Sequence, residues 1–379
     1  MSVSESAVLP ASSIASGSTS AGSPQGNSGY RFIDSVSHEF RTPLSVIKEY
    51  SSLLGEGLLG DLNEEQLEFV TIVGDRADDL CNLVDDLMDS VRAEAGMVAA
   101  QRRPTPIADI LERVEESIRH KTTVRGISLV MVLPDSLPAI YCDPGQAGRV
   151  LFNLVVNGIK YTDTGGEIRI TGRPSADGHA VCIAVKDSGR GFREEDARNI
   201  SNRLQNPHER PETRTKGFGL ALNIANALVD QCFGQMQLDS VQGDGNTFSF
   251  SMPVAEFPAL CHCYLSRLQR MYGADCPVAC LSISTGTPVD DSQSAQLHAH
   301  IEALSGTGNL VWRVAAGDWV VLAAGAAVDT AGLNAALHSA VQTSMEERPE
   351  LTLPLPAATL LETSPCSDAG LVLRVLEKM

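Results

Sequence analysis

The stretch SVSHEFRTPLSVI, residues 35–47, sets a histidine, an acid, an arginine, a threonine and a proline into a segment with helical periodicity. Its apolar stripe has spacings of three, four and once seven residues, through Ile33, Val36, Phe40, Leu44, Ile47 and Leu54. At about 100° per residue, His38 lies about 170° from the centre of this stripe and faces solvent. By position alone, an exposed histidine on a helix is most often simply hydrated.

The neighbours of His38 favour a chemical role. Glu39 stands beside it as a base that can accept the Nδ1 proton, which leaves the Nε2 lone pair available for attack on phosphorus. Thr42 projects from the same face of the helix. Pro43 removes the amide that would bind the carbonyl of Glu39, which favours a bend just after the histidine. His38, Glu39 and Thr42 are therefore the candidate catalytic residues.

A second apolar stripe predicts a helical hairpin. It follows the turn-like GEGLLGD and runs at nearly heptad spacing, through Leu67, Val70, Val73, Leu80, Val84, Leu87 and Val91. Two long amphipathic helices joined by a short loop form an antiparallel hairpin, and such seams commonly pair two hairpins in a dimeric four-helix bundle. We assign this hairpin to residues 30–97.

The remaining segments indicate a multidomain chain. Residues 1–29, rich in Ser, Gly, Ala and Pro, predict a disordered tail, and residues 98–106 predict a linker. Over residues 107–254, helices and strands alternate without the rhythm of a parallel doubly wound sheet, which favours an α+β sandwich. Residues 255–379 have the order β-α-β-β-α-β, with the last strand at LTLPLP (351–356), which predicts a ferredoxin-like domain.

Composition limits the partners and the compartment. With 379 residues, the chain can hold two or three domains with cores of their own. A net charge of -18 argues against nucleic acid or anionic membrane as the main partner. No apolar run approaches the roughly 18–20 residues that span a bilayer. The nine scattered cysteines are typical of reduced thiols, so we expect a cytoplasmic protein without membrane insertion.

A polar helix predicts a site for a metal and phosphates. In DPGQAGRVLFNLVVNGIKYT, residues 143–162, Asn153 and Asn157 lie four apart on one face, and Lys160 follows three residues later. Neutral oxygen ligands and a cation suit Mg²⁺ and the phosphates that it bridges. Two asparagines at this spacing are more often ordinary polar residues on a helix surface, but here the flanking apolar residues fix their orientation.

Two glycine-rich stretches add the surroundings of a nucleotide. In VKDSGRGF (185–192), Asp187 follows a strand and can accept from the exocyclic amine of adenine, while Gly189 and Gly191 let the backbone approach the base. In TKGFGLAL (215–222), Gly217 and Gly219 precede a helix, whose free amides and positive dipole end favour phosphate.

These stretches resemble the boxes of the sensor histidine kinases of two-component signalling. SHEFRTPL is similar to the phosphoacceptor box, which implies that His38 is phosphorylated, that Glu39 is the base, and that Thr42 orients water in a phosphatase reaction. The later boxes, with QGDGNTFSFSMP (242–253), occur in the family's order and imply a Bergerat-type (GHKL) ATP-binding fold. The implied ATP and Mg²⁺ ligands are Asn153, Asn157, Lys160, Tyr161, Asp187, Gly189, Gly191, Gly217, Gly219 and Leu220, with Asn157 holding the metal.

Two departures from the family pattern bear on activity. Gly158 replaces the alanine usual after Asn157. The expected ATP lid, residues 193–215, lacks the phenylalanine usual in its middle, for which Leu204 is the candidate substitute. Arg210 and Arg214 of this lid can meet the γ-phosphate, although a charged loop is more often solvated.

The C-terminal region resembles a degenerate diguanylate cyclase. WRVAAGDWVVLAAG (312–325) aligns with the family hairpin, but its RYGGDEF signature is lost after Arg313. Ser282 and Ser284 stand where two metal-binding acids are expected, so cyclisation should fail. We expect a sensory or docking domain for a ligand or protein partner. A zinc site at Cys261, Cys263, Cys276 and Cys280 is disfavoured by their spacing.

The sequence therefore predicts a homodimeric, ATP-dependent protein histidine kinase. Its phosphoryl group would pass from His38 to an aspartate of a separate response regulator, since no receiver-like segment is recognisable in the chain. Two alternatives stay open. One is a phosphatase of the regulator that uses Thr42, and the other is a nucleotide-binding signalling scaffold with little kinase activity.

Overall fold

The computed structural model describes residues 24–94, 102–134, 136–205, 220–306, 308–325, 329–347, 352–368 and 370–378. Within its helices, the side chains of residues 24–38, 41, 75, 78, 79, 82, 83, 85–94, 220, 347, 376 and 378 lie outside the description. The chain divides into two compact units. One contains the first two helices and the beginning of α6, and the other contains everything else that is described from β1 onward.

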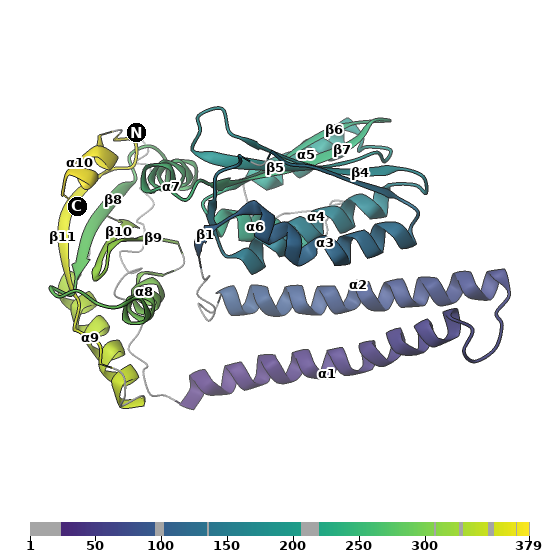
Figure 1. Ribbon diagram of the computed structural model, residues 1–379, viewed down its shortest axis with the longest axis horizontal. Coiled ribbons are helices and arrows are strands. Elements are labelled where there is room, and N and C mark those ends of the chain that lie inside the picture. The colour runs from purple at the N-terminus through teal and green to yellow at the C-terminus, as the bar shows by residue number, and fades with distance from the viewer. Residues whose placement is uncertain are drawn as a thin grey trace, which may run out of the picture. The chain divides into compact units, whose positions relative to one another are not determined.

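The hairpin unit consists of α1 (Pro24–Gly55) and α2 (Glu64–Glu94) (Figure 1). Helix α1 begins at Pro24 rather than at Tyr30 and continues through Pro43. A reciprocal cap starts α2: the Asn63 amide donates to Gln66 Oε1 at 3.1 Å, and the Gln66 amide donates to Asn63 Oδ1 at 2.8 Å. Leu44 of α1 and Val84 of α2 are buried against each other, which joins the two helices.

The second unit begins with a five-stranded sheet in the order β2-β4-β5-β7-β6. The strands are β2 (Ser128–Val132), β4 (Glu167–Pro174), β5 (Ala180–Asp187), β6 (Gln235–Val241) and β7 (Gly245–Pro253); only β2 and β4 pair in parallel. One face is covered by α3 (Ile107–Val124), α4 (Pro144–Tyr161) and α6 (Leu220–Gln231) (Figure 1). Helix α5 (Glu194–Gln205) follows β5. This two-layer arrangement agrees with the expected α+β sandwich.

Strand alternation explains the two faces of this sheet. On β7, Phe248 and Phe250 are buried toward the helices, whereas Ser249 and Ser251 lie on the opposite face. Helix α4 begins at an Asp143 cap, whose carboxylate accepts from the Gly145 and Gln146 amides at 2.8 and 3.2 Å.

The expected linker, residues 98–106, is in part a strand. Arg103–Thr105 form β1, which pairs antiparallel with β3 (Ile140–Cys142), and Thr105 is buried. A three-residue strand is too short to show a periodic pattern, so its pairing with a segment far along the chain could not be foreseen.

The C-terminal region contains α7 (Phe257–Tyr272), β8 (Pro277–Ser284), α8 (Asp291–Ser305), β9 (Leu310–Ala315), β10 (Asp318–Ala324), α9 (Thr330–Glu347), β11 (Ala357–Pro365) and α10 (Leu371–Lys378). Its antiparallel sheet has the order β11-β8-β10-β9. The strand expected at residues 351–356 is wrong, because β11 begins at Ala357. Pro354 and Pro356 remove two amide donors that a paired strand would need.

Both faces of the C-terminal sheet are covered (Figure 1). Leu281 and Ile283 pack with α8 and α9, whereas Val278 and Cys280, which alternate with them on β8, pack with α7 and α10. Tyr141 and Phe233, from the five-stranded domain, belong to this second cluster. This cluster therefore connects the C-terminal region to the five-stranded domain within one unit.

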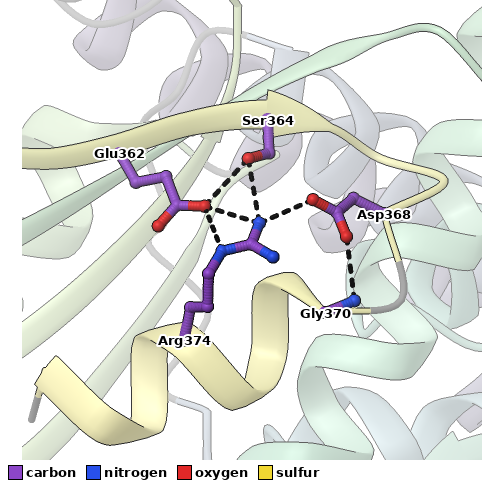
Figure 2. A network of polar contacts seen from close by, with 5 residues as sticks. All are labelled: Glu362, Ser364, Asp368, Gly370 and Arg374. Atoms are coloured by element: carbon purple, nitrogen blue, oxygen red, sulfur yellow. Dashed lines mark hydrogen bonds and ion pairs between the residues drawn. The ribbon is translucent and has the colours of Figure 1, made fainter.

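Arg374 attaches α10 to the end of β11 (Figure 2). Its Nε donates to Glu362 Oε1 at 2.7 Å, and its Nη2 contacts Asp368 Oδ2 at 2.5 Å and Ser364 Oγ at 3.2 Å. Asp368 also accepts from the Gly370 amide at 2.9 Å, at the start of α10. Hydrogen bonds to Glu362 and Asp368 raise the pKa of Arg374. The hydrogen bonds from Arg374 and the Gly370 amide lower the pKa of Asp368.

Polar contacts join the C-terminal region to the five-stranded domain. Arg267 of α7 donates from Nε and Nη2 to the two oxygens of Asp230 at 3.0 and 2.8 Å, and both side chains are nearly buried. Arg102 lies 3.5 Å from Glu302 of α8, where the side chains are only 5% and 7% exposed. The Arg102 guanidinium also stacks over Phe233 and donates to the Gln231 carbonyl.

Among the described residues, no helix is long and apolar enough to cross a membrane. All nine cysteines are free thiols.

We expect acid to weaken this joint through His298. Burial, with the charges of Arg102 and Arg313, lowers the pKa of His298 to about 4, and Glu302 Oε2 lies 3.8 Å from its Nε2. Because the native pKa is below the unfolded value near 6.5, the stability present above pH 6.5 is lost as the pH falls toward 4. When the pH is lowered from 7.5 to 5, this histidine should reduce the free energy of unfolding by about 2 kcal/mol.

Urea unfolding at the two pH values measures this cost. His298→Gln should reduce the pH dependence by that amount, whereas His120→Gln, at an exposed position on α3, should leave it unchanged. An equal pH dependence in the wild type and His298→Gln would show that His298 does not carry the effect.

Candidate functional site

Asp187 is the buried acid of the candidate site, at the last residue of β5. It is only 2% exposed. Its Oδ1 accepts from the Gly189 amide at 2.9 Å and from the Asn246 amide at 3.2 Å, while Oδ2 accepts from Asn246 Nδ2 at 3.1 Å. Burial raises the pKa of this carboxyl, and the three donors oppose that shift. The site therefore holds a carboxylate with capacity to accept further hydrogen bonds.

Glycines let three backbone segments meet around Asp187. A Cβ on Gly189 would lie 2.3 Å from the Tyr161 carbonyl, one on Gly191 would lie 2.3 Å from the Val241 carbonyl, and one on Gly245 would lie 1.9 Å from the Asp187 carbonyl. Gly191 and Gly245 also adopt positive φ, which favours glycine. Gly189 and Gly191 thus permit close packing of the protein's own backbone. That they also let the backbone approach an adenine base stays a prediction.

Close packing at position 158 explains why glycine stands there instead of the alanine usual in the family pattern. A Cβ at this position would lie 2.8 Å from Ile168 Cδ1 and 3.4 Å from Asp187 Cβ. Helix α4 therefore packs closely against the strands at this point, which brings its last turns beside Asp187.

The polar residues of α4 occupy the same end of the sheet. The Asn157 amide nitrogen is buried and has no hydrogen-bond partner among the described residues. Buried polar atoms of this kind are normally satisfied by water or a ligand. Asn153 is half-buried, and Lys160 is exposed, with its ammonium group 5.9 Å from the centre of the Tyr161 ring. Tyr161 packs edge to face on Phe192 at 5.6 Å.

Asn246 is a site residue that sequence reasoning missed. It is 1% exposed, and besides its two donations to Asp187 it accepts from Ser240 Oγ at 2.7 Å. Ser240 Oγ in turn accepts from the Phe192 amide at 2.8 Å. The position of Asn246 directly after Gly245, within the last glycine box, was the only signal in the sequence.

Several predicted site residues lie outside the described part. Gly217, Gly219, Arg210 and Arg214 belong to residues 206–219, and the side chain of Leu220 is also outside it. Leu204 is buried in α5, and its carbonyl accepts from Asn226 Nδ2 at 3.2 Å.

The predicted phosphoacceptor stretch lies within α1. The backbone at His38 is helical, while its side chain is outside the described part. Glu39 and Thr42 are exposed. The hairpin and the Asp187 site belong to different units, so each is described by itself.

The cysteines of the disfavoured zinc site belong to an apolar core. Cys261, Cys276 and Cys280 are buried among the residues that α7 and β8 contribute to it. In the part of the chain that the structure describes, no three His, Cys, Asp or Glu side chains are grouped to hold a metal ion.

Two family models match the chain. Residues 30–96 match the His Kinase A (phospho-acceptor) domain. Residues 142–256 match the histidine kinase-, DNA gyrase B-, and HSP90-like ATPase. The first match contains His38, Glu39 and Thr42, and the second contains α4, Asp187 and Asn246.

Relatives among characterised proteins share this part of the chain. Histidine protein kinase DivJ of Caulobacter vibrioides is 29% identical over 231 residues, which are 60% of this chain and 38% of the relative. Circadian input-output histidine kinase CikA of Synechococcus elongatus is 28% identical and is matched over 59% of this chain and 29% of its own length. The chain thus spans well under half the length of either relative.

A solved structure matches over a similar share. The crystal structure of full-length ShkA in complex with AMPPNP has 27% sequence identity and a TM-score of 0.42, and the match covers 59% of this chain and 46% of that one.

Gly245→Ala tests the close approach at Asp187. We expect it to cost about 2–4 kcal/mol of stability and to abolish nucleotide binding, because the new Cβ would collide with the Asp187 carbonyl. Gly243→Ala is the matched control: it has the same sign of φ in the same turn, but no atom within 4 Å, and should cost only about 1 kcal/mol. The free energy of unfolding is measured in urea, and nucleotide affinity by titration with a fluorescent ADP analogue. Equal losses of stability and affinity in Gly245→Ala and Gly243→Ala would contradict this account.

Proposed function

We propose that this chain is an ATP-dependent protein histidine kinase that phosphorylates its own His38 and passes the phosphoryl group to an aspartate of a separate response regulator. The observation that carries the proposal is the presence, in one chain, of a phospho-acceptor domain match that contains His38 and an ATPase match that contains the Asp187 site. Each match alone would fit a narrower role, either as an acceptor or as a nucleotide-binding module.

The adenine base would bind at Asp187. Its carboxylate retains acceptor capacity beyond the contacts with Gly189 and Asn246, so it can accept from the exocyclic amine. The backbone at Gly189 and Gly191 would approach the base closely, and Tyr161 with Phe192 would supply an aromatic edge beside it. The raised pKa of Asp187 predicts that this hydrogen bond weakens on acidification sooner than an exposed aspartate would.

The phosphates and Mg²⁺ would lie along α4. The donor set fits the metal, because Asn153 and Asn157 offer neutral amide oxygens. Asn157 Nδ2 is buried without an acceptor in the described part, and it would donate to a phosphate oxygen. Lys160, exposed at the end of the same helix, can meet a phosphate oxygen. When bound, Mg²⁺ would neutralise phosphate charge during transfer. Gly217, Gly219 and Leu220 complete the proposed phosphate contacts.

At the hairpin, His38 would act as the nucleophile. Its Nε2 lone pair forms a bond to the γ-phosphorus while the bond to the β,γ-bridging oxygen breaks, and ADP leaves with that electron pair. Glu39 accepts the proton from Nδ1, which keeps the ring neutral after phosphorylation. Thr42, exposed one turn further along α1, would orient water in the reverse, hydrolytic role.

The hairpin surface supports a homodimer. Phe40, Tyr50 and Phe69 are 52%, 59% and 61% exposed in the single chain. Further exposed apolar residues on the two helices are Val46, Ile47, Leu67, Ile72, Val73 and Leu80. This number of exposed apolar side chains on two long helices suits burial against a second copy in a four-helix bundle. Free thiols at all nine cysteines support a reducing, cytoplasmic location.

For the C-terminal region, we propose a ferredoxin-like domain related to inactive diguanylate cyclases, with a sensory or docking role. The strand order β11-β8-β10-β9 and the antiparallel pairing support the fold. Ser282 and Ser284 on β8 pair with Val320 and Asp318 of β10, and neither offers a carboxylate for a metal. This arrangement supports the absence of cyclase chemistry.

Its contacts with Arg102 support a role in control. Arg102 immediately precedes β1, on the chain segment that connects α2 to the ATPase domain, and Glu302 of α8 is its buried counter-charge. A change in α8 would therefore act directly on this connecting segment.

Phosphorylation of the purified chain with γ-labelled ATP and Mg²⁺ tests the kinase. We expect label that is labile in acid and stable in alkali, because a phosphoramidate on histidine has that chemistry. His38→Gln should lose the label through loss of the acceptor, and Asn157→Asp should lose it through failure of the metal site. Nucleotide binding without any transfer in the wild type would refute the kinase and leave the scaffold.

Glu302→Gln tests the role of the C-terminal region. Because it leaves Arg102 buried without a counter-charge, we expect it to cost about 3 kcal/mol of stability. The segment that carries Arg102 would then be held less tightly. We expect a several-fold higher rate of autophosphorylation, with unchanged affinity for ATP, at a temperature where the variant stays folded. Glu346→Gln, at an exposed position on α9, is the control. An unchanged rate in Glu302→Gln would exclude control through this contact.

A further inference from the structure

A cavity of about 330 Å³ lies between the outer face of the five-stranded sheet and helix α7. Its sheet wall is formed by Cys182, Gln235, Gln237, Ser249 and Ser251. Because these residues alternate with the buried ones on β5, β6 and β7, the cavity opens on the face opposite α3, α4 and α6. It is therefore separate from the nucleotide site. We call it the α7 pocket.

The α7 wall carries a positive charge without a matching acid. Arg270 lines the pocket from an exposed position on α7, and partial desolvation lowers the pKa of its guanidinium. With the Gln235 amide turned so that its oxygen faces Arg270, that oxygen accepts from Nε at 2.8 Å and from Nη1 at 2.5 Å. Among the described residues, no carboxylate forms an ion pair with Arg270, so its direct partner is a neutral amide.

The nearest acid is already engaged. Asp230 favours the charged form of Arg270, but both of its oxygens accept from Arg267, at 3.0 and 2.8 Å. Two guanidinium groups and one carboxylate leave this wall with a net positive charge. A partly desolvated guanidinium of this kind is well suited to a carboxylate or a phosphate, which its planar fork can bind through two hydrogen bonds.

The other end of the pocket carries a hydrogen-bond acceptor, the carboxylate of Asp177, rather than a guanidinium group. Asp177 accepts from Ser175 Oγ at 2.5 Å and from the His179 amide at 3.0 Å, and these contacts lower the pKa of its carboxyl. His262 lies 3.7 Å from Asp177 and stacks on His179 at 4.2 Å. This acid is largely exposed to solvent and can accept from an ammonium or hydroxyl group of a ligand.

We propose that the α7 pocket binds a small polar molecule that carries one carboxylate or phosphate group and at least one hydrogen-bond donor. The anionic group would bind Arg270, and the donor would face Asp177. Serine and glutamine side chains line the space between them, and the volume is at the lower end of the range for small-molecule sites.

A ligand in this pocket would bridge two parts of the unit. It would contact the sheet of the ATPase domain and α7 of the C-terminal region together, and so stabilise their joint. That the ligand serves as an input to the kinase rests on the proposed function, whereas binding itself rests only on the pocket.

Thermal unfolding of the full chain tests binding without nucleotide. The probes are inorganic phosphate and sodium glutamate, each compared with sodium chloride at equal ionic strength. We expect a saturable rise in Tm with at least one probe. A rise with phosphate alone assigns a phosphate ligand, and a rise with glutamate alone assigns a carboxylate.

Three variants make the test specific. Arg270→Gln should lower the affinity for the probe that gave the saturable rise about tenfold or more, because it removes a charge-assisted hydrogen bond. Ser249→Val should weaken it by filling the sheet side of the pocket without changing charge. Arg169→Gln, at an exposed position on β4, should bind as the wild type does. No stabilisation by either probe, or equal stabilisation in all variants, would overturn the proposal.

Binding of a fluorescent ADP analogue and autophosphorylation are measured in the same variants. Both should persist in Arg270→Gln and Ser249→Val without added probe. Loss of transfer in the wild type would refute the kinase alone and would leave the result for the α7 pocket unaffected.

Discussion

The structure of the candidate site depends on one buried carboxylate, that of Asp187. Ionising it costs free energy, as its raised pKa shows, and the amides of Gly189 and Asn246 offset only part of this cost. The Asn246 side chain holds the second oxygen. Because its donors come from two segments, the acid also brings the end of β5, the following turn and the start of β7 to one point. Glycine at position 245 is what permits that convergence.

A second constraint joins the C-terminal region to the ATPase domain. The face of its sheet formed by Val278 and Cys280 is buried under α7 and α10, and Tyr141 and Phe233 complete the core from the other domain. The nearly buried Arg267–Asp230 pair adds directional contacts to this apolar packing. A buried ion pair contributes more to a unique geometry than to stability, so it suits a joint whose register must be fixed. The α7 pocket lies at the same joint.

The helices and the glycine boxes could be predicted from the sequence because their signals are local. Apolar spacing located α1 and α2, and the types of residue around Asp187 indicated a nucleotide site before any contact was known. The strand β1 and the burial of Arg102 could not be predicted in this way, because their partners, β3 and Glu302, lie far along the chain. Asn246 was missed for the same reason: its role is defined only by its contact with Asp187.

The sequence by itself determined the order of the domains, the chemistry of the candidate residues and the close-approach glycines, because periodicity, residue type and short spacings are properties of neighbouring positions. Only the tertiary structure decided that the C-terminal region packs on the ATPase domain and that Arg270 and Asp177 line the same cavity. Both facts depend on which distant surfaces meet. That outcome is set by the packing of whole faces and by the cost of burying charge, which no local pattern records.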